Sequence, residues 1–430
     1  MSSQALSAGW FHARRPREAS TPDAKGGMMR HVTVVDAIRR RSMLLAAVLA
    51  AVLALLPWLA EAQPITIGVH YPLTGPSSEL GQGFQYGAQL ALSEINAHGG
   101  VNGREMKLIL VDDKSTPDGA VTAIQRLTVG SNVALVWGGS SSSPTVAVLP
   151  RLKAGPTPYY VGFASDPRVL EPFSRFVFSG ASAPVAAVVA GVADFVAHTL
   201  KGSAVAILSC DQANCKIAGP MVRKALQDAG VAVAAEQSFH SGDTDFTGQI
   251  NALKSARPDV IVLWGLPVDG GRLVGQMRRA GITAKIVGDT GVADQTVIDL
   301  AGPAAEGVYA MWVGGSQFIG DPTGPMAEWQ GRFAKAFPNA PTGFPNQYSL
   351  RAYADAYVIA EALRRCGPNV TSETIATQLD TIRDFVGGKD ATFTYAAAVG
   401  LPRSFSPTQH QGTTALAPVV VKDGRFQAVP

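Results

Sequence analysis

A run of small polar residues follows an apolar segment at residues 136–150, which read VWGGSSSSPTVAVLP. Four consecutive hydroxyl groups after an expected strand suit three kinds of chemistry: nucleophilic catalysis, the cradling of a phosphate, or the binding of a small carboxylate. A hydrolase nucleophile needs the pattern Gly-x-Ser-x-Gly on a tight turn. Gly139-Ser140-Ser141-Ser142 lacks the second glycine, and no histidine has a local context that marks it as a general base. A serine-dependent enzyme is therefore disfavoured.

Nucleotide binding is also poorly supported. Gly81-Gln82-Gly83-Phe84-Gln85-Tyr86 approaches the dinucleotide pattern G-x-G-x-x-G, but Tyr86 stands where the third glycine belongs. The chain has no G-x-x-x-x-G-K-[ST] phosphate loop either. We expect these glycines to admit a close backbone approach at the start of a helix.

The carboxylate interpretation has a physical mechanism. Pro144 suits the first position of a helix and Ser143 suits its N-cap. The first N–H groups of that helix would then point at the end of the strand, beside the partial positive charge of the helix dipole, and Ser142 would add a hydroxyl. Ser140 and Ser141 are expected to be small polar spacers. Plain helix capping without a ligand remains an equal alternative on these grounds.

The first 62 residues differ in composition from the rest. They hold eight Lys and Arg against four acidic residues, a net charge of +4 that leaves −1 for the remainder of a chain with formal charge +3. Arg39–Arg41 precede the apolar stretch Met43–Ala60, and Ala60-Glu61-Ala62 matches a small-x-small cleavage site. We predict an N-terminal extension and signal peptide over residues 1–62, cleaved after Ala62, and a periplasmic protein. A retained membrane anchor is the alternative.

The net charge and the cysteine content argue against several classes of binding partner. The near-neutral body lacks the clustered positive charge of a nucleic-acid surface. Cys210 and Cys215 flank the short loop DQAN and could form a disulfide in an oxidising compartment, with two free thiols as an even alternative. With Cys366 they do not have zinc-site spacing, and we expect neither a metal nor a cofactor.

Strand and helix patterns alternate along the remainder. Asn102-Gly103 predicts a tight turn before a strand. The segments expected to form buried strands are ITIGVHY, MKLILVDD, VALVWG, PYYVGFAS, SAVAILS, PDVIVLWG and AKIVGD. Continuous apolar strands separated by helices are typical of parallel sheets covered on both faces. We predict an α/β chain with two doubly wound parallel-sheet lobes.

The residues from Ile67 to Val121, which begin IGVHYPLTGPSSELGQGFQYG, resemble the opening of the branched-chain amino acid (Leu/Ile/Val) periplasmic binding proteins of ABC transporters. DTDFTGQINALKSARPDVIVLWG, QMRRAGITAKIVGDTGVA and LAGPAAEGVYA match patterns of that family in the same order. The resemblance implies the type I periplasmic binding fold, with two lobes that close on a ligand. Its three crossovers would lie near residues 182, 314 and 388. The implied N-terminal lobe is 63–182 plus 315–388, and the C-terminal lobe is 183–314 plus 389–430.

The resemblance also implies a ligand site. It places the ligand carboxylate on Ser142 and Ser165, and the ligand amino group on the carbonyl of Phe163. The complete set of implied ligand-binding residues is Ser142, Ser143, Phe163, Ala164, Ser165, Asn214, Leu266, Asp289, Thr290 and Tyr348.

Several positions depart from the family pattern. Leu80 and Leu266 replace tyrosines, and a further expected tyrosine falls at Asn214 or Cys215. The glutamate that pairs with the ligand ammonium becomes Thr290, beside Asp289. These changes suggest that the carboxylate half of the site is kept and the amine half is altered, unless Asp289 or Asp211 substitutes. Arg351 is placed either to hold a second anionic group or to lie along a helix surface.

We therefore expect a monomeric, non-enzymatic solute-binding protein that delivers a small carboxylate-bearing ligand to an ABC permease in the inner membrane. The ligand classes considered are a branched-chain or other amino acid, an amide and an aromatic acid. A periplasmic ligand sensor with the same fold is the alternative function.

Overall fold

The computed structural model describes residues 38–47, 63–180, 183–313, 324–385 and 402–429. The chain divides into a unit of residues Met1–Glu61, in which residues 38–47 form an exposed helix, and a unit of residues Ala62–Pro430. The expected cleavage site and the expected crossovers near residues 182, 314 and 388 lie outside the described residues. Within the described ranges, no helix has both the length and the apolar character needed to cross a bilayer.

The first sheet has five parallel strands in the order β2-β1-β3-β4-β5. They are β1 (Ile65–Tyr71), β2 (Met106–Asp112), β3 (Leu135–Gly138), β4 (Tyr159–Val161) and β5 (Val177–Ser179). Neighbouring side chains of a strand point to opposite faces. Trp137 accordingly joins the apolar core on one face, whereas Val136 joins the core on the other.

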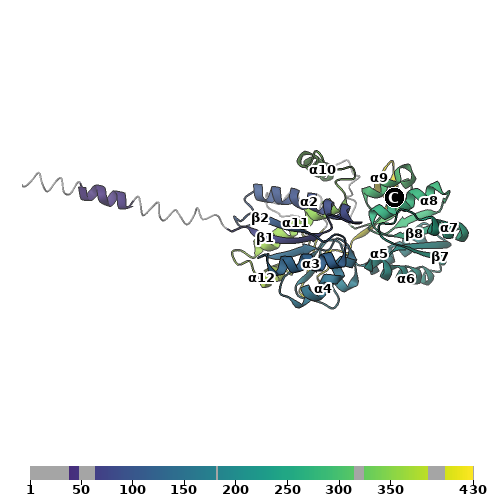
Figure 1. Ribbon diagram of the computed structural model, residues 1–430, viewed down its shortest axis with the longest axis horizontal. Helices are drawn as coiled ribbons and strands as arrows, with labels where there is room; N and C mark the ends of the chain where they lie inside the picture. Colours follow the sequence, from purple (N-terminus) through teal and green to yellow (C-terminus); the bar gives the residue numbers. More distant parts are fainter. Residues whose placement is uncertain (1–37, 48–62, 181–182, 314–323, 386–401, 430) are drawn as a thin grey trace, which may run out of the picture. The chain divides into compact units, whose positions relative to one another are not determined.

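Helices cover both faces of this sheet (Figure 1). One face carries α2 (Ser78–Ala97) and α11 (Gln347–Arg365), and the other carries α3 (Pro117–Val129) and α4 (Ser142–Ala154). The short elements α12 (Ser372–Leu379) and η2 (Pro167–Val169) complete this part of the chain, and α10 (Gly324–Ala336) packs near α2.

The second sheet has seven strands in the order β12-β11-β10-β9-β8-β6-β7. They are β6 (Ala204–Cys210), β7 (Ala232–Phe239), β8 (Val260–Trp264), β9 (Lys285–Gly288), β10 (Tyr309–Val313), β11 (Leu416–Lys422) and β12 (Arg425–Ala428). Its helices are α5 (Val185–Asp194), α6 (Ala213–Asp228), α7 (Thr247–Ala256), α8 (Pro267–Arg279) and α9 (Gln295–Ala301), with the short elements η3 (Phe195–Thr199) and η4 (Gly302–Ala305). The predicted α/β class with two parallel sheets is confirmed, although β11 and β12 add an antiparallel edge that was not predicted.

The last part of the chain returns to the first sheet before it enters the second. Ser179 of β5 donates its backbone N–H to the carbonyl of His410 at 2.9 Å, and Arg403 approaches Asp355 of α11 at 3.3 Å. The expectation that residues 389–430 belong to the second lobe stays a prediction, and we propose that residues 403–411 belong to the first lobe instead, because of these contacts. We propose that the last crossover falls between residues 411 and 416, because β11 begins at Leu416. The rest of the expected lobe division stays a prediction.

Glycines allow α2 to pack unusually close to α11. A Cβ atom added to Gly87 would lie 2.0 Å from the carbonyl oxygen of Ser349, and one added to Gly83 would lie 2.3 Å from Oδ1 of Asn346. Gly81 likewise lies against the backbone of Pro72. The two glycines that approached a nucleotide pattern thus leave room for neighbouring groups, the Pro72 backbone at Gly81 and the Asn346 side chain at Gly83.

We predict that Gly87→Ala lowers the stability of the protein by about 1–3 kcal/mol, because overpacking forces backbone shifts. Gly331→Ala is the matched control. Gly331 is exposed in the middle of α10, and nothing lies within 4 Å of a Cβ added there. It should leave the melting temperature unchanged or raise it slightly, since alanine favours helices. Thermal unfolding checks both variants, and an unchanged melting temperature for Gly87→Ala would refute the packing argument.

Candidate functional site

The serine run lies at the carboxyl end of β3 and the start of α4. Gly139 has φ +79°, a conformation that favours glycine, and its carbonyl accepts the N–H groups of Phe163 at 3.0 Å and Ala164 at 2.8 Å. These bonds tie the serine run to the loop after β4. Ser140, Ser141 and Ser142 are only 1%, 4% and 3% exposed.

Helix α4 begins earlier than the sequence suggested. Its first residue is Ser142 and its N-cap is Ser141, whose backbone is extended. The expectations that Ser143 is the N-cap and Pro144 the first helical residue are wrong. Proline is tolerated throughout the first turn, where backbone N–H groups have no acceptor within the helix, so its position does not fix the helix start.

Two hydroxyl groups in the serine run are buried without a protein partner. Among the described residues, Oγ of Ser140 and Oγ of Ser141 make no hydrogen bond, and Ser141 does not cap the helix with its side chain. A buried polar group without a partner costs about 1–3 kcal/mol, and such groups are uncommon in native proteins. The expectation that both serines are small polar spacers does not account for these buried hydroxyls. Only the length of the serine run could have indicated them.

A small apolar cluster combines side chains from the two sheet-containing parts of the main unit, and it reaches the serine run through Phe163, whose N–H donates to the carbonyl of Gly139. Leu80 of α2, Tyr348 of α11 and Leu266, the N-cap of α8, form one buried cluster, with Phe163 packed against it. The rings of Phe163 and Tyr348 meet edge to face at 4.7 Å. The hydroxyl of Tyr348 is buried with no hydrogen-bond partner in the described part of the chain. The structure thus brings together three implied ligand residues: Phe163, Leu266 and Tyr348.

Arg351 lies one helical turn beyond Tyr348 and is buried. It is 7% exposed, and its guanidinium carbon lies 4.5 Å from the centre of the Phe163 ring, a cation–π contact. Burial lowers the pKa of Arg351 to about 10. The alternative that Arg351 lies along a helix surface is therefore wrong, and a positive charge stands beside the aromatic pair.

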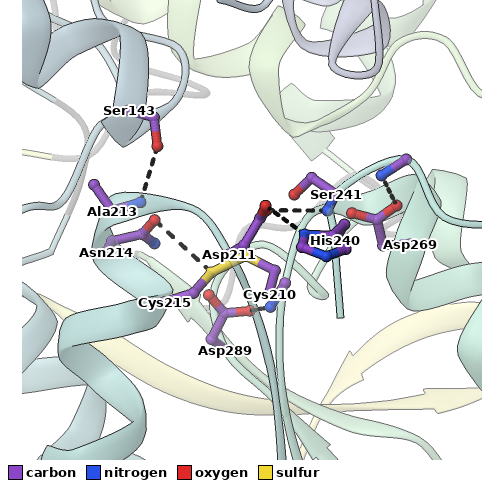
Figure 2. Close-up of a disulfide and its surroundings, with 12 residues drawn as sticks. Ser143, Cys210, Asp211, Ala213, Asn214, Cys215, His240, Ser241, Asp269 and Asp289 are labelled. Atoms are coloured by element: carbon purple, nitrogen blue, oxygen red, sulfur yellow. Dashed lines mark hydrogen bonds and ion pairs between the residues drawn. A yellow bond between two sulfur atoms is a disulfide. The ribbon is translucent and has the colours of Figure 1, made fainter. Parts of the chain in front are cut away.

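The two candidates for an ammonium partner make other contacts. Asp289, after β9, accepts the N–H of Gly265 at 3.3 Å, and burial raises its pKa to about 7 although backbone N–H groups oppose the shift. Asp211 accepts from Nδ1 of His240 at 3.0 Å and from the N–H of Ser241 at 3.1 Å. Figure 2 shows Asp211 turned toward these two residues. The carbonyl of Thr290 accepts from Nε2 of Gln347 at 3.1 Å.

The loop after β6 is closed by a disulfide. Cys210 and Cys215 are bridged with an S–S distance of 2.02 Å, and Asn214 lies inside the loop (Figure 2). Ser143, an implied ligand residue, accepts the N–H of Ala213 from this loop at 3.0 Å. Ser143 therefore joins α4 of the first lobe to the start of α6 in the second.

Two further implied ligand residues, Ala164 and Ser165, follow Phe163 in the loop after β4. Ala164 and Ser165 line a cavity of about 300 Å³ together with Ser179, Pro184 and His410. No group of three or more His, Cys, Asp or Glu side chains suited to a metal ion occurs in the part of the chain that the structure describes.

Comparisons with known proteins agree with this architecture. The pattern of the periplasmic binding protein family matches residues 64–425. The chain is 28% identical over 318 residues to the leucine-, isoleucine-, valine-, threonine- and alanine-binding protein of Pseudomonas aeruginosa, covering 71% of this chain and 79% of the relative. It is 29% identical over 343 residues to the Leu/Ile/Val-binding protein BraC3 of Rhizobium johnstonii, covering 78% and 88%.

A solved structure shares the fold. The branched-chain amino acid transporter substrate-binding protein LivJ of Streptococcus pneumoniae, crystallised with isoleucine, aligns with a TM-score of 0.72 at 22% identity, covering 85% of this chain and 98% of that one. The family match includes all strands of the first sheet, the serine run after β3, and strands β6 to β11 of the second sheet. The chain therefore belongs to the periplasmic binding protein family, a non-enzymatic family of solute-binding proteins.

Proposed function

We propose that this protein is the extracytoplasmic solute-binding component of an ABC importer, exported by its N-terminal segment, and that it delivers a small carboxylate-bearing ligand to the permease. The observation that carries the proposal is the pair of buried, unpartnered hydroxyls of Ser140 and Ser141 at the N-terminus of α4. A carboxylate there would accept from these hydroxyls and from the first N–H groups of the helix, at the positive end of its dipole.

The apolar cluster supports a ligand with a hydrophobic or aromatic body. Leu80, Leu266 and the edge-to-face pair Phe163–Tyr348 offer aliphatic and aromatic contact, and the N–H of Phe163 ties this cluster to Gly139, the residue before the serine run. The unpartnered hydroxyl of Tyr348 offers a further polar contact. Small-molecule sites commonly combine an apolar lining with a few convergent polar groups.

The part of the site that would hold the α-ammonium group of an amino acid differs, in our proposal, from that of an ordinary α-amino acid binder. An α-ammonium group needs an ionised carboxylate or several acceptors, and a hydrogen bond to a charged group is worth about 1.5–3 kcal/mol. Asp289 is held by backbone N–H groups and has a pKa near 7, and Asp211 is held by His240 and Ser241. We infer that the preferred ligand is a carboxylate or amide without an α-amino group.

A matched pair of ligands tests this ligand class. Leucine and 4-methylpentanoate differ only by the α-amino group, as do phenylalanine and 3-phenylpropanoate. We predict that the acid without the amine binds at least tenfold more tightly in one or both pairs, because the ammonium loses a charged partner. Isothermal titration calorimetry measures the four dissociation constants. Micromolar binding of leucine with weaker binding of 4-methylpentanoate would show that the amine half of the site is intact.

Removing a hydroxyl from the serine run should have opposite effects on stability and binding. We predict that Ser141→Ala leaves the melting temperature of the ligand-free protein unchanged or about 1–2 °C higher, because it removes a buried group without a partner. The same variant, and Ser142→Ala, should weaken binding of the acid identified above by about tenfold, as a hydrogen bond to a charged carboxylate is lost.

Ser255→Ala is the control for these variants, since Ser255 is exposed on α7 and bonds only to Asn251 of its own helix. It should change neither the melting temperature nor the affinity. If Ser141→Ala and Ser142→Ala both bound the acid as tightly as the unmodified protein, the carboxylate site would have to lie elsewhere.

A further inference from the structure

Ser143 makes a hydrogen bond between the two lobes, and ligand binding alone does not require this bond. Its Oγ lies on the first turn of α4, in the first lobe, and accepts the N–H of Ala213, the first residue of α6 in the second lobe, at 3.0 Å. Figure 2 shows the Ser143 side chain pointing at this N–H. The two residues are 70 positions apart in the chain, and α4 and α6 pack against each other.

The N–H of Ala213 is a group that its own helix cannot satisfy. The first N–H groups of any α-helix have no acceptor within the helix. The N-cap of α6 is Gln212, which makes no side-chain cap, so the usual local acceptor is missing. The hydroxyl of Ser143 supplies that acceptor from the opposite lobe.

The disulfide restricts the position of this donor. Cys210 is the last residue of β6 and Cys215 is the third residue of α6, so the bridge closes the short connection that carries Ala213. Asp211 in the same connection is tied to His240 and Ser241, which adds a second restraint. A restrained donor loses less conformational freedom when it bonds across lobes.

A second bridge joins the lobes at another place. The backbone N–H of Gln347 on α11 donates to Oδ2 of Asp294 at 3.1 Å, and Nε2 of Gln347 donates to the carbonyl of Thr290 at 3.1 Å. The first and second lobes are thus hydrogen-bonded at the starts of two second-lobe helices, α6 and α9. The Ser143 contact belongs to this set of interlobe bonds rather than to the ligand cluster.

We propose that Ser143 is a positioning residue that holds the closed form of the protein, and that the Cys210–Cys215 loop is its preformed receptor. The contact between Oγ of Ser143 and the N–H of Ala213 stabilises closure whatever solute lies between the lobes. The proposal rests on the proposed binding function only in that closure is needed to retain a solute.

Hydrogen exchange at one amide tests the contact directly. In protein labelled with [15N]alanine, the Ala213 amide should be protected, although it has no acceptor in its own helix. Ser143→Ala should speed its exchange about fivefold or more, as expected for a neutral hydrogen bond, whereas Ser143→Thr, which keeps the hydroxyl, should retain protection. The Ala229 amide, which donates to the carbonyl of Ala225 at 3.1 Å, is the internal control and should not change. Equal Ala213 exchange in the unmodified protein and Ser143→Ala would overturn the proposal.

The disulfide is tested by the Cys210→Ser/Cys215→Ser variant and by reduction of the unmodified protein with a phosphine. Both should speed exchange at Ala213 and leave Ala229 protected. An unchanged Ala213 rate, or an equal acceleration at Ala229, would overturn the role of the bridge as a receptor for Ser143.

The effect of Ser143→Ala on ligand affinity distinguishes a role of Ser143 in closure from a direct contact with the ligand. Leucine and 4-methylpentanoate serve as probes. Ser143→Ala should weaken the binding of every probe that binds, and the factor, about fivefold, should be the same for each. A loss confined to one of two bound probes would make Ser143 a ligand contact and overturn the proposal. If neither probe binds, the proposed ligand class fails, while the exchange experiment still decides the role of Ser143.

Discussion

The backbone of Gly138 and Gly139 has no room for side chains, and the candidate site depends on this constraint. A Cβ on Gly138 would lie 2.2 Å from Nε2 of His70, and one on Gly139 would lie 2.7 Å from Cγ1 of Val161. His70 is itself fixed, because its ring contacts Asp113 at 3.2 Å and the hydroxyl of Tyr159 at 2.8 Å. The chain can therefore turn sharply from β3 into α4 and lie against the loop after β4. The loop that carries Phe163 consequently lies against the backbone just before Ser140–Ser142.

Hydrogen bonds from Thr145 and the β4 loop hold this turn. The Thr145 hydroxyl donates to the carbonyl of Ser141 at 2.6 Å, and the N–H of Gly162 donates to Gly138 at 2.8 Å. These bonds satisfy the backbone and leave the hydroxyls of Ser140 and Ser141 without partners among the described residues. Unpaired buried groups persist where the surrounding structure over-determines the local conformation, and they are concentrated at functional sites. The hydrogen bonds that hold the turn thus leave these two hydroxyls for the proposed ligand.

The elements of the fold could be predicted from local pattern, and the partners of the site residues could not. Apolar runs predicted β1, β8 and β9 because buried strands bury both faces, and Asn102 and Gly103 form the predicted turn with φ 52° and 77°. The start of α4 was misjudged because Pro144 fits any position of the first turn. The burial of Arg351 and the bond of Ser143 to Ala213 depend on residues that are distant in sequence. No periodicity encodes such contacts.

Helix termini connect the lobes and would also form the proposed ligand site, so a single serine run would serve two purposes. The hydroxyls of Ser140 and Ser141 lie at the start of α4, and the hydroxyl of Ser143, in the first turn of the same helix, accepts from the N–H of Ala213 at the start of α6. A ligand carboxylate at α4 and the N–H of Ala213 at Ser143 would therefore be fixed by the same turn of helix. Binding and closure would then be mechanically coupled, because a shift of α4 that improves one contact moves the other. The four serines of the run are consequently not equivalent: the hydroxyls of Ser140 and Ser141 are buried without a partner among the described residues, whereas that of Ser143 bonds to the other lobe.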